Sequence, residues 1–187
     1  DNQEIQADQL PALTRRWCER HTGIGADGLI LIKVLDFDQG RVSFRIFNAD
    51  GSEAEISGNG LRCASAFLFH YQKVPGKMIN FETIVGEHLT ELISRDNNHF
   101  EIRTDMGQPK FSSKDIPFDD GSEHDFIIDY PLSINRKIYN ITCVSTGNPH
   151  CDIFVERFFP ARIEWHQIGQ EVEHHPFFPN RTNVEFI

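Results

Sequence analysis

The sequence lacks the features that mark membrane proteins and nucleic-acid-binding proteins. No apolar run approaches the roughly 20 residues that a membrane-spanning helix needs, and the acidic start, DNQEIQADQ, is unlike a signal peptide. Basic residues are few: 18 Lys and Arg stand against 28 Asp and Glu, the net charge is −10, and no basic cluster is longer than Arg15-Arg16. We therefore expect a soluble, cytoplasmic protein that binds neither membranes nor nucleic acid.

Cysteine is also scarce. The four cysteines, Cys18, Cys63, Cys143 and Cys151, form no CxxC pair and no zinc-like spacing. Because 39% of the residues are hydrophobic and 16 are Phe, the chain can build a core without disulfides, and we expect reduced thiols. Cys18 and Cys63 fall on apolar faces of predicted helices, so we expect both in the core.

The hydrophobic pattern predicts an α/β fold of the α+β kind. Strands are expected over residues 29–34, 42–46, 78–84, 88–94, 100–104, 126–130, 137–145, 150–155 and 183–187. Helices are expected from Asp8, as the cap, to Gly23, and over 61–71 and 164–173. The helix over 61–71 is apolar nearly all round, which predicts an enclosed helix. Hairpins, rather than crossovers, are expected to connect the first half.

The composition divides the chain into two units, 1–107 and 108–187. Residues 106–121 are rich in Gly, Pro, Ser, Lys and Asp, which indicates a linker. Each unit is rich in strands and carries a Gly-Asn turn, a sign of an ancient duplication. The second unit ends inside an apolar strand, so we expect it to be incomplete.

Two patterns that suggest cofactors do not hold up. Gly23-Ile-Gly-Ala-Asp-Gly28 matches GxGxxG, but a dinucleotide site needs a strand before it and a helix after it, and here that order is reversed. A tight turn is the better interpretation. The adjacent His174 and His175 would point to different faces of a helix and have no third ligand at suitable spacing, so no metal is expected.

The segment ISGNGLRC places Ser57, Gly58, Asn59 and Gly60 directly before a predicted helix. Glycines there leave the first N–H groups unobstructed, and the helix dipole adds positive charge, so a carboxylate is the natural ligand. The turn NADGS at 48–52 could face the same point. The alternative is that Ser57 only caps the helix.

A related segment, STGNPH, occupies residues 145–150 where one predicted strand ends and the next begins. Asn148 could hold a ligand amine or carboxylate, and His150 could tune a nearby acid or base. The alternative is an Asn-Pro turn that carries a surface histidine.

Four segments together closely resemble the diaminopimelate epimerase family. They are RHTGIGADGLILI (20–32), FRIFNADGSEAEISGNGLRC (44–63), VSTGNPHCDIFVE (144–156) and FPNRTNVEFI (178–187). The resemblance implies two pseudo-symmetric units, each a curled mixed sheet around a central helix, with the active site in the cleft between them. It also implies epimerisation of an amino-acid α-carbon by two cysteines, one per unit, without pyridoxal phosphate or another cofactor.

The resemblance assigns roles to the residues of ISGNG. Gly58, Asn59 and Gly60 would form the cradle for the substrate carboxylate. Ser57 stands at the position of the first catalytic cysteine, and a hydroxyl is a much poorer base than a thiolate. Ordinary two-thiol epimerisation is therefore in question, and activity is expected to be low or altered.

Further residues follow from the same resemblance. Asn48, Asn148 and Asn183 would contact the substrate, and His150 would modulate the thiol pair. The family's first strand is absent before residue 1, and its glutamate-arginine pair and second catalytic cysteine are absent after residue 187. Gly28 stands where glutamine is frequent in the family, which removes one polar contact.

We therefore expect a diaminopimelate epimerase or close relative, in partial or impaired form, that converts LL- to meso-diaminopimelate for lysine and peptidoglycan precursors. Two alternatives stay open. One is a cofactor-independent racemase or isomerase of another amino or imino acid, with a single acid/base. The other is a non-catalytic paralogue that binds an amino acid or pairs with another subunit. A homodimer is one assembly that the sequence leaves open.

Overall fold

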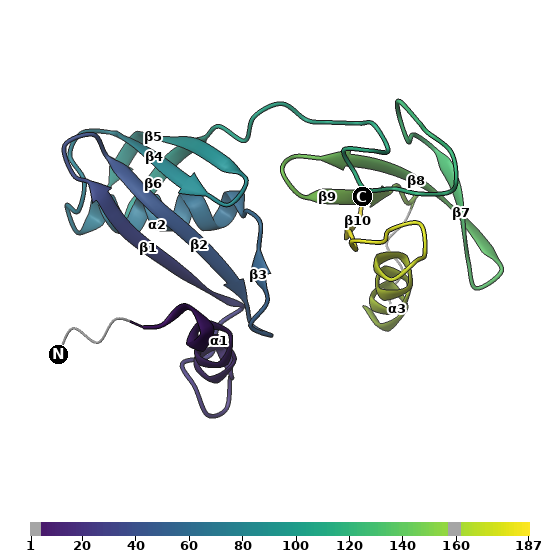
Figure 1. Ribbon diagram of the computed structural model, residues 1–187, viewed down its shortest axis with the longest axis horizontal. Coiled ribbons are helices and arrows are strands. Elements are labelled where there is room, and N and C mark those ends of the chain that lie inside the picture. Colours follow the sequence, from purple (N-terminus) through teal and green to yellow (C-terminus); the bar gives the residue numbers. More distant parts are fainter. Residues whose placement is uncertain (1–4, 157–161) are drawn as a thin grey trace. The chain divides into compact units, whose positions relative to one another are not determined.

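The computed structural model describes residues 5–156 and 162–187 (Figure 1). The chain forms two compact units; the first ends at Met106 and the second begins at Gly107. Each unit has its own sheet and its own hydrophobic core, as expected for an α+β fold. None of the helices in this described part is long and apolar enough to span a membrane.

The first unit contains one mixed sheet. Its strands are β1 (Gly28–Asp36), β2 (Arg41–Asn48), β3 (Glu53–Ala54), β4 (Met78–Thr83), β5 (Gly86–Asp96) and β6 (His99–Thr104). Their order is β1-β2-β4-β5-β6, with β3 also paired to β2. The β1/β2, β4/β5 and β5/β6 pairs are antiparallel, but β2 and β4 are parallel. The expectation of hairpins alone was therefore wrong, because a parallel pair needs a crossover. Helix α2 (Gly58–His70) supplies it.

The core of this unit lies between α2 and the sheet (Figure 1). The rings of Phe44 and Phe81 meet edge to face with centroids 5.7 Å apart. Beneath α2, the buried hydroxyls of Ser65 and Thr90 lie 2.8 Å apart, so each has a partner. The other buried residues of this core are Val42, Ile56, Leu61, Ala64, Leu68, Phe69, Val74 and Ile79.

The sequence predicted that helix α2 is enclosed on every side, and this prediction was wrong. Phe67 and Tyr71 are 50% and 57% exposed. Cys63, predicted to be core, is exposed. The helix buries only the stripe that faces the sheet, and these three residues lie outside it.

The first helix differs from its prediction at both ends. Asp8 lies in a 3-10 turn, η1 (Ala7–Gln9), which runs into α1 (Leu10–Cys18), so it does not cap the helix. The helix ends at Cys18, which is buried as predicted. Gly23 does not terminate it but packs on its end: a Cβ there would lie 2.3 Å from the Arg16 carbonyl oxygen, so only glycine fits.

The second unit contains a four-stranded sheet and one helix. Its strands are β7 (Tyr130–Ile134), β8 (Lys137–Ser145), β9 (Pro149–Ile153) and β10 (Asn183–Phe186), in the order β10-β9-β8-β7; its helix is α3 (Arg162–Glu173). β7, β8 and β9 pair antiparallel, while β10 runs parallel to β9.

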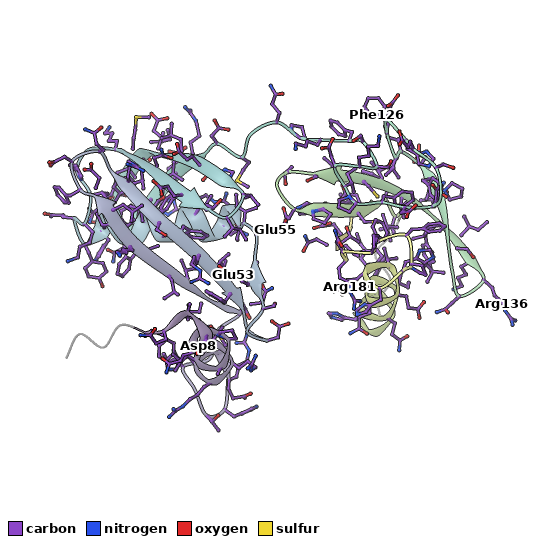
Figure 2. All side chains as sticks on the ribbon, viewed as in Figure 1. Asp8, Glu53, Glu55, Phe126, Arg136 and Arg181 are labelled. Carbon is purple, nitrogen blue, oxygen red and sulfur yellow. The ribbon has the colours of Figure 1, made fainter. Side chains whose placement is uncertain are left out.

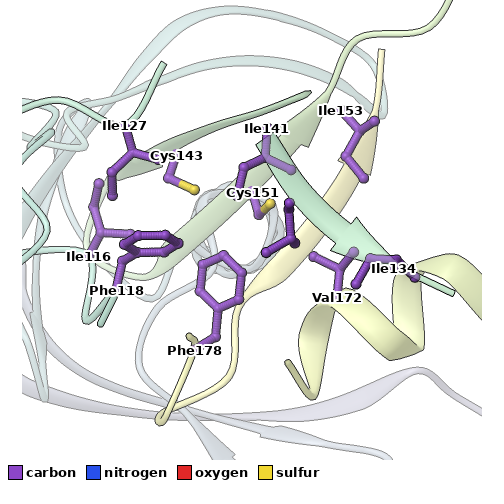
Figure 3. Close-up of a cluster of buried hydrophobic side chains, with 11 residues drawn as sticks. Ile116, Phe118, Ile127, Ile134, Ile141, Cys143, Cys151, Ile153, Val172 and Phe178 are labelled. Carbon is purple, nitrogen blue, oxygen red and sulfur yellow. The ribbon is translucent and has the colours of Figure 1, made fainter. Parts of the chain in front are cut away.

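Two predictions for the second unit were wrong. Residues 106–121 do not form a simple linker, because Ile116 and Phe118 are buried with Phe178 and Ile127 in the core (Figure 3). The predicted strand over 126–130 is also absent, and the strand begins only at Tyr130. Ile127 alone is buried there, while Phe126, labelled in Figure 2, and Ile128 are 61% and 60% exposed, so this apolar run does not mark a buried strand.

Candidate functional site

Ser57 is the N-cap of α2. Its Oγ accepts a hydrogen bond from the Gly60 N–H at 3.0 Å, and its carbonyl oxygen accepts from the Leu61 N–H at 2.8 Å. Gly60 is buried, and its N–H is occupied by this cap. The predicted cradle of three free amides is therefore reduced to two, because the Gly60 N–H already donates to Ser57 Oγ.

The two preceding amides are different. Within the described residues, the N–H groups of Gly58 and Asn59 have no hydrogen-bond acceptor. The Arg62 guanidinium donates to Asn59 Oδ1 and lies 3.6 Å from where a Gly58 side chain would begin. Two N–H donors, the helix dipole and one cation thus meet at the start of α2, an arrangement that suits a carboxylate. Sequence reasoning missed Arg62, which its spacing of three from Asn59 on a helix could have indicated.

Asn48 and Asp50 stabilise the turn after β2. Asn48 Nδ2 donates to Ser52 Oγ at 3.0 Å, and Asp50 Oδ1 accepts from the Ser52 hydroxyl and N–H at 2.6 and 2.8 Å. The hydrogen bond from the Ser52 side chain holds the pKa of Asp50 below its usual value. The contacts of Asn48 thus lead to Ser52, and none in the described part of the chain leads to Ser57.

In the second unit, three predicted site residues lie together. His150 on β9 is directly opposite Asn183 on β10. Asn183 Nδ2 donates to the Pro149 carbonyl oxygen at 2.9 Å, and His150 Nε2 lies 3.0 Å from Asn148 Oδ1. The His150 side chain is 26% exposed and hydrogen-bonded at both ring nitrogens, so it is not a free surface histidine.

Sequence reasoning missed Glu185, which completes this group. Its Oε1 lies 2.8 Å from His150 Nδ1, and its Oε2 is buried with no hydrogen-bond partner among the residues described. Glu185 follows Asn183 by two residues on β10, so both side chains leave the same face of the strand. This alternation along the predicted strand could have indicated that Glu185 lies on the same face as Asn183.

The remaining histidine and glycine patterns serve local structure. His174 Nδ1 contacts the Gln170 carbonyl oxygen, and His175 Nδ1 accepts from the Phe177 N–H. Burial lowers the pKa of His175. Over residues 5–156 and 162–187, no group of three or more His, Cys, Asp or Glu is placed to hold a metal. The GxGxxG letters lie after α1 and lead into β1, so the order is indeed the reverse of a dinucleotide site.

A separate cavity of about 440 Å³ lies in the second unit between α3 and β10. Trp165 and Phe186 line it, with ring centroids 4.4 Å apart, and Asn183 reaches its rim from β10. His150 and Glu185 do not line this cavity. His150 and Glu185 therefore lie outside this cavity, although Asn183 lines it.

Each unit thus contains a polar group that could take part in binding or proton transfer. The start of α2 can bind an anion, and the group around His150 can hold a polar ligand and move a proton. The Ser57 hydroxyl contacts only the Gly60 N–H, and no described imidazole or carboxylate lies within hydrogen-bond reach of it. Nothing in this part of the chain therefore activates Ser57 as a base.

Comparison with known proteins gives a consistent result. Residues 1–112 match the sequence model of a family described as diaminopimelate epimerase. The chain is 43% identical over 176 residues to the diaminopimelate epimerase of Halothermothrix orenii, covering 94% of this chain and 61% of that protein. It is 45% identical over 179 residues to that of Moorella thermoacetica, covering 95% and 62%. The chain therefore spans about three fifths of the length of these relatives.

Solved structures support the fold. A probable proline racemase from Agrobacterium radiobacter K84 superposes with a TM-score of 0.66 at 16% identity, covering 98% of this chain and 56% of that one. A hydroxyproline epimerase from Agrobacterium vitis gives 0.63 at 16% identity, covering 95% and 56%. At this identity the likeness concerns the fold alone, and it agrees with the predicted α+β architecture.

Proposed function

Because the chain belongs to the diaminopimelate epimerase family, we propose that the natural protein containing it inverts the α-carbon of diaminopimelate, from the LL to the meso form, by proton transfer. The observation that carries this proposal is the start of α2, where the N–H groups of Gly58 and Asn59 remain available beside a cation. An amino-acid substrate always brings a carboxylate, which is the ligand this arrangement favours.

The same groups explain how the reaction would be assisted. Removal of the α-proton leaves a carbanion whose negative charge spreads onto the carboxylate. Donors already aimed at that carboxylate bind it more strongly as the charge grows, and this lowers the barrier. Gly58 and Asn59 would supply the two N–H donors, and Arg62 would add a positive charge within the same turn.

The serine at position 57 limits the chemistry. The family resemblance places a catalytic cysteine there, whose thiol loses its proton near pH 8.5, whereas a serine hydroxyl needs a strong partner. Among the residues that the structure describes, the hydrogen bond of Ser57 Oγ is the one it accepts from the Gly60 N–H. We therefore propose that this form of the protein is impaired in proton abstraction, while the capacity to bind the substrate is retained.

In the second unit, we propose that Asn148 and Asn183 contact the substrate and that His150 modulates the proton transfer. Their support is their proximity: His150 contacts Asn148 directly and is opposite Asn183 in the sheet. We further propose that the enzyme acts in the cytoplasm, in lysine biosynthesis, without pyridoxal phosphate. A homodimer belongs to the same proposal.

The test is exchange of the diaminopimelate α-proton with solvent deuterium, measured by NMR on the natural full-length protein. We expect slow exchange with Ser57 and, for Ser57→Cys, exchange faster by about 10²-fold or more, the scale of a positioned acid or base. Ser133→Cys, which places a thiol at an exposed position on β7, should change nothing. No exchange in either Ser57 form would contradict the proposal.

The alternatives give different results in the same experiment. Exchange of proline or another amino acid in place of diaminopimelate would favour a racemase or isomerase of different specificity. Calorimetric binding of diaminopimelate without exchange, even in Ser57→Cys, would favour a non-catalytic paralogue.

A further inference from the structure

Glu185, His150 and Asn148 form a continuous chain of side-chain contacts in the second unit. Glu185 Oε1 lies 2.8 Å from His150 Nδ1, and His150 Nε2 lies 3.0 Å from Asn148 Oδ1. The imidazole is partly buried, with 26% of its side chain exposed. Both ring nitrogens are therefore engaged, and the ring links a carboxylate on one side to an amide on the other.

The sheet register produces this chain. His150 pairs with Asn183 across the parallel β9 and β10, and Asp152 pairs with Glu185 two residues further on. Alternate residues of a strand leave the same face, so His150 and Glu185 are diagonal neighbours on one face. Cys151 and Val184 belong to the opposite, core face. The Glu185 carboxylate reaches back along the sheet to the ring.

The chemistry of the three groups fixes where the proton lies. A carboxylate oxygen only accepts hydrogen bonds, so the contact with Glu185 requires a proton on His150 Nδ1. The hydrogen bond made by one ring nitrogen determines the state of the other. With Nδ1–H held by Glu185, Nε2 of the neutral ring can only accept, so it pairs with the N–H₂ end of the Asn148 amide. A half-turn of the amide about χ2 exchanges Oδ1, which lies 3.0 Å from Nε2, for Nδ2 and leaves the carbonyl end for a ligand.

We infer that Glu185 is a positioning residue: by holding the proton on His150 Nδ1, it fixes how the ring meets Asn148 and so which end of the Asn148 amide faces a bound amino acid. The inference rests on the proposed function, in which Asn148 contacts the substrate. Glu185 itself need not touch the substrate, and it acts through His150.

Removal of Glu185 has a definite consequence. Without an acceptor at Nδ1, a neutral imidazole is free to carry its proton on Nε2 and to donate it to Asn148 Oδ1, so the opposite end of the amide then faces the ligand. A ligand would have to turn the amide back on binding. The loss of one oriented hydrogen bond corresponds to about ten-fold in affinity.

The experiment uses the natural full-length protein with ¹⁵N-labelled histidine rings. His150, one of nine histidines in the chain, is assigned from His150→Gln. In the wild type and in Glu185→Gln, which keeps an acceptor oxygen, Nδ1 should carry a proton. In Glu185→Leu, Nδ1 should lose it, and diaminopimelate should bind about ten-fold more weakly by calorimetry. Asp152→Asn, which removes a carboxylate from the same sheet face without touching His150, should match the wild type.

The inference is overturned if Glu185→Leu keeps the proton on Nδ1, or if it loses that proton and binds diaminopimelate unchanged. If Glu185→Leu does not fold, the Nδ1 resonance decides: it should shift in Glu185→Gln and stay in place in Asp152→Asn, and equal spectra overturn the inference. The ring signals are recorded without ligand. A wild type that shows Nδ1–H but binds no amino acid would therefore refute the proposed function and leave the link between Glu185 and His150 standing.

Discussion

Cys143 and Cys151 face each other as directly opposed residues of β8 and β9, and both are buried in the core of the second unit. The Cys143 N–H donates to the Ile127 carbonyl oxygen at 2.9 Å rather than to β9. The two cysteines thus form a non-hydrogen-bonded pair, in which opposed side chains come closest. The hydrogen bond to the Cys143 thiol, together with burial, raises the pKa of Cys151 far above its usual value. Cys151 therefore acts as a packing group rather than a thiolate, and Cys143 packs beside it in the same core.

This relationship predicts the order of thiol reactivity. In the native protein, a disulfide reagent should label Cys63 rapidly, because it is exposed, while Cys18, Cys143 and Cys151 react only after unfolding. Peptide mass spectrometry locates the label at each time. Cys63→Ala should remove the rapid phase from this chain, and Cys18→Ala should not. Rapid labelling of Cys151 in the native protein would contradict its burial in the core.

A second prediction concerns the cap of α2. Ser57→Ala removes the acceptor of the Gly60 N–H and should destabilise the first unit by about 1 kcal/mol. Ser57→Asp keeps an acceptor and should stay close to the wild type in stability, but its negative charge should abolish carboxylate binding at the same helix end. Urea unfolding followed by Trp17 fluorescence, in a Trp165→Phe background, reports on this unit. Equal stability of Ser57→Ala and the wild type would show that the cap contributes nothing.

The two glycines of the Gly-Asn-Gly segment should respond differently to alanine. A Cβ on Gly60 would lie 3.1 Å from Ile46 Cδ1 and 3.2 Å from Phe44 Cζ, inside the core. Gly60→Ala should therefore cost about 1–2 kcal/mol through overpacking. A Cβ on Gly58 would meet the flexible Met106 side chain at 3.3 Å, so Gly58→Ala should stay within about 0.5 kcal/mol. The same unfolding measurement compares them, and an equal loss in both variants would contradict this distinction.

Local patterns account for much of the fold. The apolar run after Gly28 and the alternation around Phe44 predicted the β1/β2 hairpin, and the segment predicted over 137–145 is β8 as observed. The parallel pairing of β2 with β4 was not predictable in this way, because the hydrophobic pattern of a strand does not show which other strand pairs with it. Ile116 and Phe118 were missed because isolated apolar residues among turn formers show no period.

The candidate site shows the same limit. Short-range signals and the family resemblance predicted Ser57 and His150 as site residues. The contact between Glu185 and His150 was not predicted, because it depends on the register of β10 against β9. Only the three-dimensional structure shows that register. Cys63 was misplaced for a related reason, since the sheet covers only one stripe of α2 and the sequence did not show where that stripe ends.

The last prediction concerns the response of the second unit to pH. Asp120 Oδ2 accepts from the Tyr130 hydroxyl at 2.8 Å and lies 3.0 Å from His124 Nε2. The hydrogen bond from Tyr130, and then that from His124, holds the pKa of Asp120 below its usual value. A depressed carboxyl pKa stabilises the fold above the unfolded value of about 4, and that stability is lost as the pH falls through the folded pKa. Acid should therefore weaken this unit.

Tyr130 affects the stability of the second unit at alkaline pH. Burial, and then the hydrogen bond to Asp120, raises the pKa of Tyr130. Its contribution to stability is present below the unfolded value near 10 and is lost as the pH rises through the folded pKa.

Trp165 fluorescence in a Trp17→Phe background follows urea unfolding of the second unit between about pH 2 and 11. Asp120→Asn should flatten the acid limb, Tyr130→Phe should flatten the alkaline limb, and Asp125→Asn, an exposed carboxylate of the same segment, should change neither. Identical profiles for Asp120→Asn and Asp125→Asn would show that the contact with Tyr130 does not stabilise the unit.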